Sequence, residues 1–263
     1  MNSNQNGSNV LEDKDRELAI IAALVALGEK GRKHFASHVN AALDAGALRQ
    51  EIVEMIGTFS QCSGSPAAMN GVSAAIKVFE SRDAAGVALP GEAVFEPGDA
   101  PVDDGADARF ERAKKPSSTY IYPAGPTDDV YTSVARIAPH VWRNIATFFY
   151  NDIFLHPGLD LRTRELGVFA NLAAVGTVPY QYKWHAHGAL NNGWTGRQLG
   201  EVISEIEPFI GYPTAFQAAL LLQEVLDSRN GDAGASVPEP TGSSPLHLRW
   251  ELRFWQSRER RRA

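Results

Sequence analysis

An internal repeat constrains the fold of this chain more than any other sequence feature. Arg16-Glu17-Leu18 recurs as Arg164-Glu165-Leu166. The later matches keep the same order, with one residue of difference in length between the copies: Gly28 with Gly176, His38 with His185, Gly46 with Gly193, Glu54 with Glu201, and Gly64-Ser65-Pro66 with Gly211-Tyr212-Pro213. Because order and spacing are kept, the repeat indicates two diverged copies of one structural unit.

Each copy has the apolar periodicity of α-helices. The first helix of each copy carries apolar residues three and four positions apart: Leu18, Ile21, Leu24 and Val25 in one, and Leu166, Phe169, Leu172 and Ala173 in the other. A second helix ends at Gly46 or Gly193, where glycine suits a left-handed C-cap. Third helices are expected over residues 51–58 and 198–207, and fourth helices from the prolines at 66 and 213. The sequence therefore predicts an all-α fold of two tandem helical units.

The segments outside the repeats predict the domain organisation. We expect a disordered N-terminus over residues 1–11, a first repeat over 12–80 and an extended acidic Gly/Pro-rich connector over 81–118. The second repeat spans 119–228 and includes an extra leading helix, followed by a linker over 229–245. The aromatic and basic tail, residues 246–263, is too apolar to remain free, so we expect it on the protein surface or on a neighbouring subunit.

Charge and cysteine content exclude several classes of function. The formal net charge of -6 argues against nucleic-acid binding. The N-terminus is polar, unlike a signal peptide, and no apolar run is long enough for a membrane span. These features predict a cytoplasmic protein with no nucleic-acid or membrane partner. The single cysteine, Cys62, excludes an internal disulfide and a CxxC redox pair, and is expected to be a small core residue.

One long motif resembles the carboxymuconolactone decarboxylase family. The motif is the string over residues 154–166 (FLHPGLDLRTREL), followed by His185, Gly193 and Gly211-Tyr212-Pro213. The resemblance covers residues 130–228 well and 12–80 more weakly. It implies helical units of the alkylhydroperoxidase-like superfamily, which pair and often form rings of six. A homo-oligomer is therefore expected, either a trimer forming a pseudo-hexamer or a dimer. The peroxidase branch uses CxxC and a histidine, and this chain lacks the cysteines.

An acid and an imidazole recur in both copies and are the candidate catalytic groups. Glu17 and Glu165 lie on the apolar stripes of their helices, where a carboxylate is costly unless it is paired. His38 and His185 have small neighbours on their helix faces and match the recurring histidine of the family. The ordinary interpretation is that all four are structural residues. Their repetition favours a functional pair in each copy, with copy two preferred.

The resemblance implies decarboxylation of a lactone that carries a carboxylate. This reaction needs no cofactor, because the lactone accepts the electrons left by carbon dioxide. We expect a small carboxylic acid or lactone as the substrate. Candidate substrate-binding residues near His185 are Arg164 and Lys183 for a carboxylate, Tyr182 and Trp184 as walls, and His187 as a secondary residue. No metal site is expected, since His34 and His38 have a ligand spacing that copy two does not repeat.

Two alternatives to a small-substrate lyase remain at this level. One is a cofactor-free cyclase, isomerase or decarboxylase that acts on a larger aromatic or polyketide-like molecule. The other is a non-catalytic ligand-binding or assembly protein on the same scaffold, since a fold does not fix a function.

Overall fold

A computed structural model describes residues 10–87, 105–115 and 136–231 of the 263-residue chain. Most of the predicted disordered N-terminus, much of the predicted connector, nearly all of the linker over 229–245 and the whole tail over 246–263 lie outside the described residues. Within the described ranges, every regular element is a helix.

The two sequence copies fold into matching sets of helices. Copy one contains α1 (Asp13–Leu27), a short 3-10 turn (Gly28–Lys30), α2 (Arg32–Asp44), α3 (Arg49–Thr58), the π-helical turn η2 (Ser60–Gly64) and α4 (Ser65–Ala84). Copy two contains α8 (Leu161–Val175), α9 (Pro179–Asn191), α10 (Gly196–Ile210) and α11 (Tyr212–Gly231). Gly46 and Gly193, which follow α2 and α9, both have positive φ, 89° and 93°. The all-α tandem architecture predicted from the sequence is therefore confirmed.

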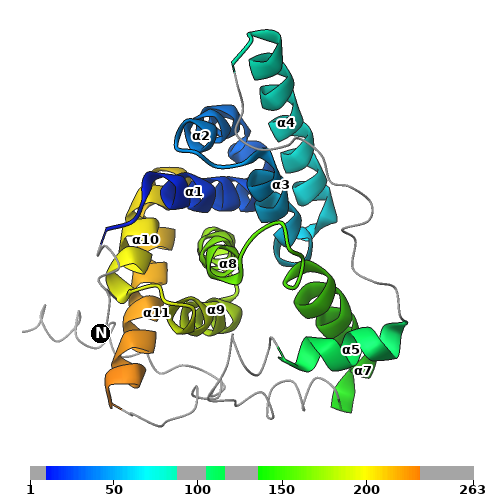
Figure 1. Cartoon of the computed structure of the whole chain (residues 1–263). Coiled ribbons are helices and arrows are strands. Elements are labelled where there is room, and N and C mark those ends of the chain that lie inside the picture. The colour runs from blue at the N-terminus through cyan, green and yellow to red at the C-terminus, as the bar shows by residue number, and fades with distance from the viewer. Residues whose placement is uncertain (1–9, 88–104, 116–135, 232–263) are drawn as a thin grey trace, which may run out of the picture.

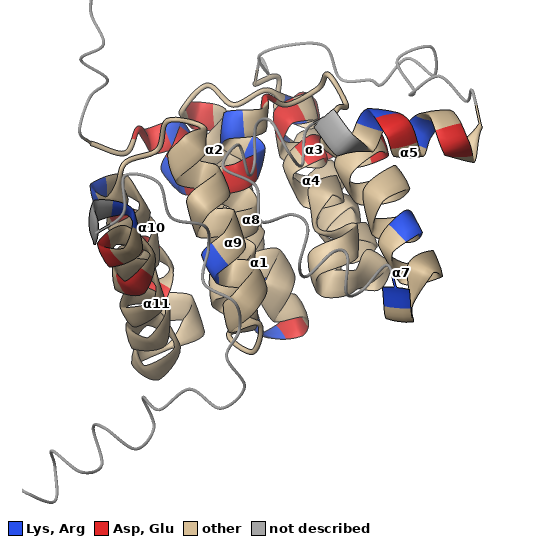
Figure 2. Ribbon diagram, turned by 90° about the horizontal axis from the view of Figure 1, so that it is seen from below, with Lys and Arg blue, Asp and Glu red and all other residues tan. Residues whose placement is uncertain are grey.

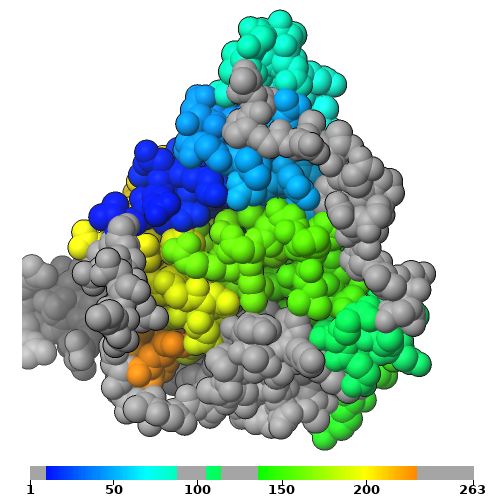
Figure 3. All heavy atoms as spheres, in the orientation of Figure 1, coloured from blue at the N-terminus to red at the C-terminus, as the bar shows by residue number. Residues whose placement is uncertain are grey.

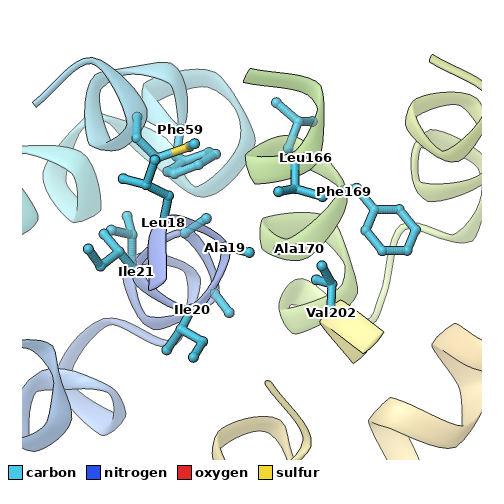
Figure 4. Close-up of a cluster of buried hydrophobic side chains, with 14 of the residues drawn as sticks. Leu18, Ala19, Ile20, Ile21, Phe59, Leu166, Phe169, Ala170 and Val202 are labelled. Atoms are coloured by element: carbon cyan, nitrogen blue, oxygen red, sulfur yellow. The ribbon is translucent and has the colours of Figure 1, made fainter. Parts of the chain in front are cut away.

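The first helices of the two copies, α1 and α8, form the centre of the molecule (Figure 1). α1 is buried without interruption from Leu18 to Val25, and α8 from Thr163 to Ala174. Side chains from both helices belong to one apolar core, in which Ala19 of α1 points toward α8, the helix that carries Leu166 and Ala170 (Figure 4). A helix buried on all faces is typical of the interior of a larger fold, so separating the two copies would expose apolar residues of both α1 and α8.

Reciprocal contacts between the copies give the chain the character of a dimer in one polypeptide. α1 packs against α10, the third helix of the other copy, and α8 packs against α3 in the same way. The amide nitrogen of Asn171 donates to the backbone carbonyl of Ala22, 2.9 Å away, and its oxygen accepts from Ser63 at 2.7 Å. A Cβ added at Gly167 would lie 2.1 Å from the sulfur of Met55, so this glycine permits the close approach of α8 to α3.

An additional helical layer precedes copy two in the chain and has no counterpart before copy one among the described residues. It comprises α5 (Ala106–Lys115), α7 (Pro139–Asn144) and the π-helix η5 (Ile145–Ile153), which pack on one another beside α3 and α8 (Figures 1 and 3). The leading helix predicted before copy two is present, although its second half is π-helical. The prediction of an extended connector is wrong over residues 106–115. These residues form α5, where Arg109 bonds Asp152 and Arg112 bonds Asn151 of η5.

Charged residues are distributed unevenly along the described helices. In Figure 2 most of the described ribbon is uncharged, and the Lys, Arg, Asp and Glu positions gather near helix ends and on α5. Among the described helices, none has both the length and the apolar character that crossing a membrane requires.

Candidate active site

The candidate site of copy two begins with Glu165 in the second turn of α8. Asp160 caps this helix, since its carboxylate accepts a hydrogen bond from the Thr163 amide at 2.9 Å. Glu165 itself is completely buried. Its Oε2 lies 2.9 Å from Nδ1 of His185 on α9, and His185 is 6% exposed. The two candidate catalytic groups of copy two therefore form a hydrogen-bonded pair in the protein interior.

Copy one contains an equivalent pair whose side chains are more exposed to solvent. Oε2 of Glu17 on α1 lies 2.7 Å from Nδ1 of His38 on α2. The side chains of Glu17 and His38 are 14% and 22% exposed, against 0% and 7% for Glu165 and His185. The repeat thus preserved the geometry of the acid–imidazole pair, whereas burial differs between the copies.

Aromatic residues of the extra layer surround the imidazole of His185. The ring of Phe149 in η5 is centred 6.1 Å from the His185 ring at 85°, and the Phe154 ring is 6.4 Å away. Both phenylalanines are buried. Copy one has no counterpart of η5 among the described residues. The rings of the extra layer therefore account for the lower exposure of the Glu165 and His185 side chains.

Each pair also faces the turn before the fourth helix of the other copy. Phe209 of copy two packs edge-on against His38, with ring centroids 5.2 Å apart, and against His34 at 5.1 Å. The matching position in copy one is Cys62, near Glu165. Burial raises the pKa of the Cys62 thiol to about 12, and the charge of Glu165 adds to this increase. Both sites therefore lie at the boundary between the copies.

Arg164, which is predicted from the sequence as a ligand for a substrate carboxylate, is engaged by protein partners in this structure. Its guanidinium is completely buried, and all three of its nitrogens donate hydrogen bonds within the protein. The partners are Glu54 at 2.6 Å, Thr58 at 2.9 Å and the carbonyl oxygens of Leu159 and His156 at 3.1 and 2.9 Å. Arg164 instead fixes the start of α8 against α3.

The other four proposed substrate-binding residues also contact protein side chains or backbone in this structure. The Tyr182 hydroxyl donates to the backbone carbonyl of Ala218 at 2.9 Å, and Lys183 pairs with Glu224 at 3.4 Å. Trp184 is buried and packs against the Tyr180 ring. His187 lies 3.3 Å from Arg229. Tyr182, Lys183 and His187 thus make polar contacts with α11, on the side of α9 that does not face η5.

Sequence reasoning missed the residues that enclose the pair. Phe149 falls in the leading helix expected before copy two, Phe154 begins the motif over residues 154–166, and Cys62 is expected to be a small core residue; none of the three was assigned to the site. The one available signal was that the leading helix is present before copy two and absent before copy one.

A groove of about 590 Å³ lies between α2 and α4 of copy one, but neither Glu17 nor His38 is among its lining residues.

Comparison with known proteins matches the two copies separately. The model of the carboxymuconolactone decarboxylase family matches residues 3–77 and 139–224, which together make up more than half of the chain. A curated relative, 4-carboxymuconolactone decarboxylase of Acinetobacter baylyi, is 31% identical over 81 residues. That alignment covers 31% of this chain and 60% of the relative, so it spans less than two thirds of the relative's length. With two matched regions that coincide with the two helical units, this chain belongs to the carboxymuconolactone decarboxylase family.

Proposed function

We propose that this protein is a cofactor-free carbon–carbon lyase that decarboxylates a small lactone or related cyclic carboxylic acid at the Glu165–His185 pair. The observation that carries the proposal is the complete burial of a carboxylate hydrogen-bonded to an imidazole. A carboxylate that orients an imidazole in enclosed surroundings is a common arrangement in active sites that transfer protons. Family membership and the named activity of the Acinetobacter relative support the choice of reaction class.

His185 serves as the proton donor in this mechanism. The bond between the substrate ring and its carboxylate breaks, carbon dioxide leaves, and the electron pair moves into the lactone as an enolate. The imidazolium of His185 then donates the proton on Nε2 to carbon, and the site regains one proton from solvent. Within the described part of the chain, Nε2 makes no hydrogen bond to protein and is available for this step.

Glu165 positions the imidazole and stabilises its charged form. Its Oε2 accepts from Nδ1, which fixes the ring orientation and directs Nε2 away from α8. Phe149 and Phe154 limit water around the pair. A dry environment favours loss of a carboxylate, because the charge spreads over a larger group as carbon dioxide departs. We assign the reaction to copy two, because the Glu17–His38 pair is more exposed and Phe209 packs against its imidazole.

The matched histidines provide the test. His185→Gln is expected to lower the rate of carbon dioxide release from 4-carboxymuconolactone by about 100-fold or more, the usual contribution of a positioned general acid. His38→Gln is expected to retain most of the activity. Circular dichroism of both variants checks that each is folded. Equal rates for His185→Gln and the wild type would refute the assignment, and a wild-type protein that decarboxylates no butenolide acid would refute the reaction.

A further inference from the structure

The second carboxylate oxygen of Glu165 has a role that the proposed mechanism does not use. Oε1 is buried and has no hydrogen-bond donor among the described residues, whereas Oε2 is bonded to His185. In copy one the Glu17 side chain is 14% exposed, so its carboxylate can be hydrated. Burying an unpaired acceptor is costly, and native proteins retain few such groups.

The neighbouring protein donors cannot turn to satisfy Oε1. Arg164, the adjacent cation, is held by four partners on the side of α3. The Cys62 thiol is a weak donor and does not lie within hydrogen-bond distance of Glu165. The remaining sources of a strong donor for Oε1 are a buried water and a bound ligand. The rings of Phe149 and Phe154 lie beside His185, the partner of Glu165, and favour a planar, apolar ligand over a flexible polar one.

We propose that the site in copy two binds planar cyclic molecules bearing a hydroxyl or enol group, whose O–H donates to Oε1 of Glu165. This inference deepens the proposed function and rests on it for the location of the site. It narrows the substrate class to hydroxylated or enolisable cyclic acids and excludes their ether counterparts. The neutral amide Glu165→Gln gives a direct test, because its oxygen still accepts from His185 while its NH₂ replaces Oε1 with a donor.

Phenol and its methyl ether, anisole, are the probes. They share the ring and its oxygen, but only phenol can donate a hydrogen bond, and the comparison with Glu165→Gln separates this difference from the added size of the methyl group. Their dissociation constants are measured from shifts of the His185 imidazole resonances in NMR spectra of the full chain, assigned with His185→Gln. The wild type is expected to bind phenol about 10-fold or more tightly than anisole. This is the gain in affinity that one hydrogen bond to a carboxylate typically provides. Glu165→Gln is expected to lose or reverse this preference, and the matched variant Glu17→Gln is expected to keep it.

Several results would overturn the inference. These are equal affinities in the wild type, as expected if a buried water satisfies Oε1; a preference that persists in folded Glu165→Gln; or no His185 shift with phenol at its solubility limit. The outcome is separable from that of the proposed function. A preference for phenol without release of carbon dioxide would support the inference and refute the proposed reaction. Decarboxylation without that preference would support the reaction and refute the inference.

Discussion

Replacing Glu54 with alanine is expected to destabilise the junction between the two copies. Glu54 on α3 pairs with the guanidinium of Arg164 at 2.6 Å, and its side chain is only 11% exposed. Alanine would leave the completely buried Arg164 without its counter-ion. Removing one partner of a buried ion pair typically costs about 3–5 kcal/mol, because the remaining charge is neither solvated nor compensated.

The repeat supplies a control for this prediction. Glu201 is the counterpart of Glu54 in α10, but its side chain is 32% exposed and pairs with the exposed Arg197. Glu201 also accepts a hydrogen bond from the Leu11 amide at 3.0 Å. Glu201→Ala is expected to lower the unfolding free energy less than Glu54→Ala, because it removes one hydrogen bond and an exposed ion pair but leaves no buried charge. Urea unfolding followed by circular dichroism measures both variants. The double variant Glu54→Leu with Arg164→Met is expected to recover much of the loss, because it leaves no buried charge. If Glu54→Ala and Glu201→Ala lower the unfolding free energy equally, the reasoning is refuted.

Three further predictions follow from individual side chains. Gly167→Ala is expected to lower the unfolding free energy by about 1–3 kcal/mol, because its Cβ would overlap Met55. Gly200→Ala, whose Cβ would meet no atom within 4 Å, is expected to raise the unfolding free energy by up to about 1 kcal/mol. Similar effects of the two variants in urea titrations would contradict this. Cys62 is expected to react with Ellman's reagent at pH 8 on the order of 1000-fold more slowly in the native than in the urea-unfolded chain, because its pKa is raised to about 12; equal rates would count against this. Burial and the charges of Arg229 and Lys183 lower the pKa of His187 to about 4, so the unfolded chain takes up the proton first as the pH falls below about 6.5, and stability is lost. Lowering the pH from 7 to 4.5 should cost the wild type on the order of 2 kcal/mol more than His187→Gln, and parallel pH profiles of unfolding would exclude this role.

The fold was largely predictable from the sequence because both copies carry the same apolar periodicity and the same glycine and proline positions. The spacing of Leu18, Ile21 and Leu24 predicted a helix, but it did not show that α1 is buried on every face. That burial depends on contacts with α8 and α10, which lie far away in the sequence. α5 was missed because residues 106–115 are highly charged, and its stability depends on partners such as Asp152 in η5.

The site was partly predictable for the same reason. Repetition of glutamate and histidine identified Glu165 and His185, and the structure places them 2.9 Å apart. Position in the sequence did not predict where Arg164 points, since it directly precedes Glu165 but turns toward Glu54. The direction of a helical side chain depends on the element that packs against it. No local pattern specified that η5 would cover His185.

Fusing two copies into one polypeptide changes how the sites can evolve. In a dimer of identical chains, any substitution alters both sites at once. Here Cys62 faces one pair, while its duplicate position, Phe209, faces the other, and the aromatic layer adjoins His185 alone. A substitution that improves selectivity at the Glu165–His185 pair therefore leaves the Glu17–His38 pair unchanged. The Glu17–His38 pair can be kept for folding while the Glu165–His185 pair specialises.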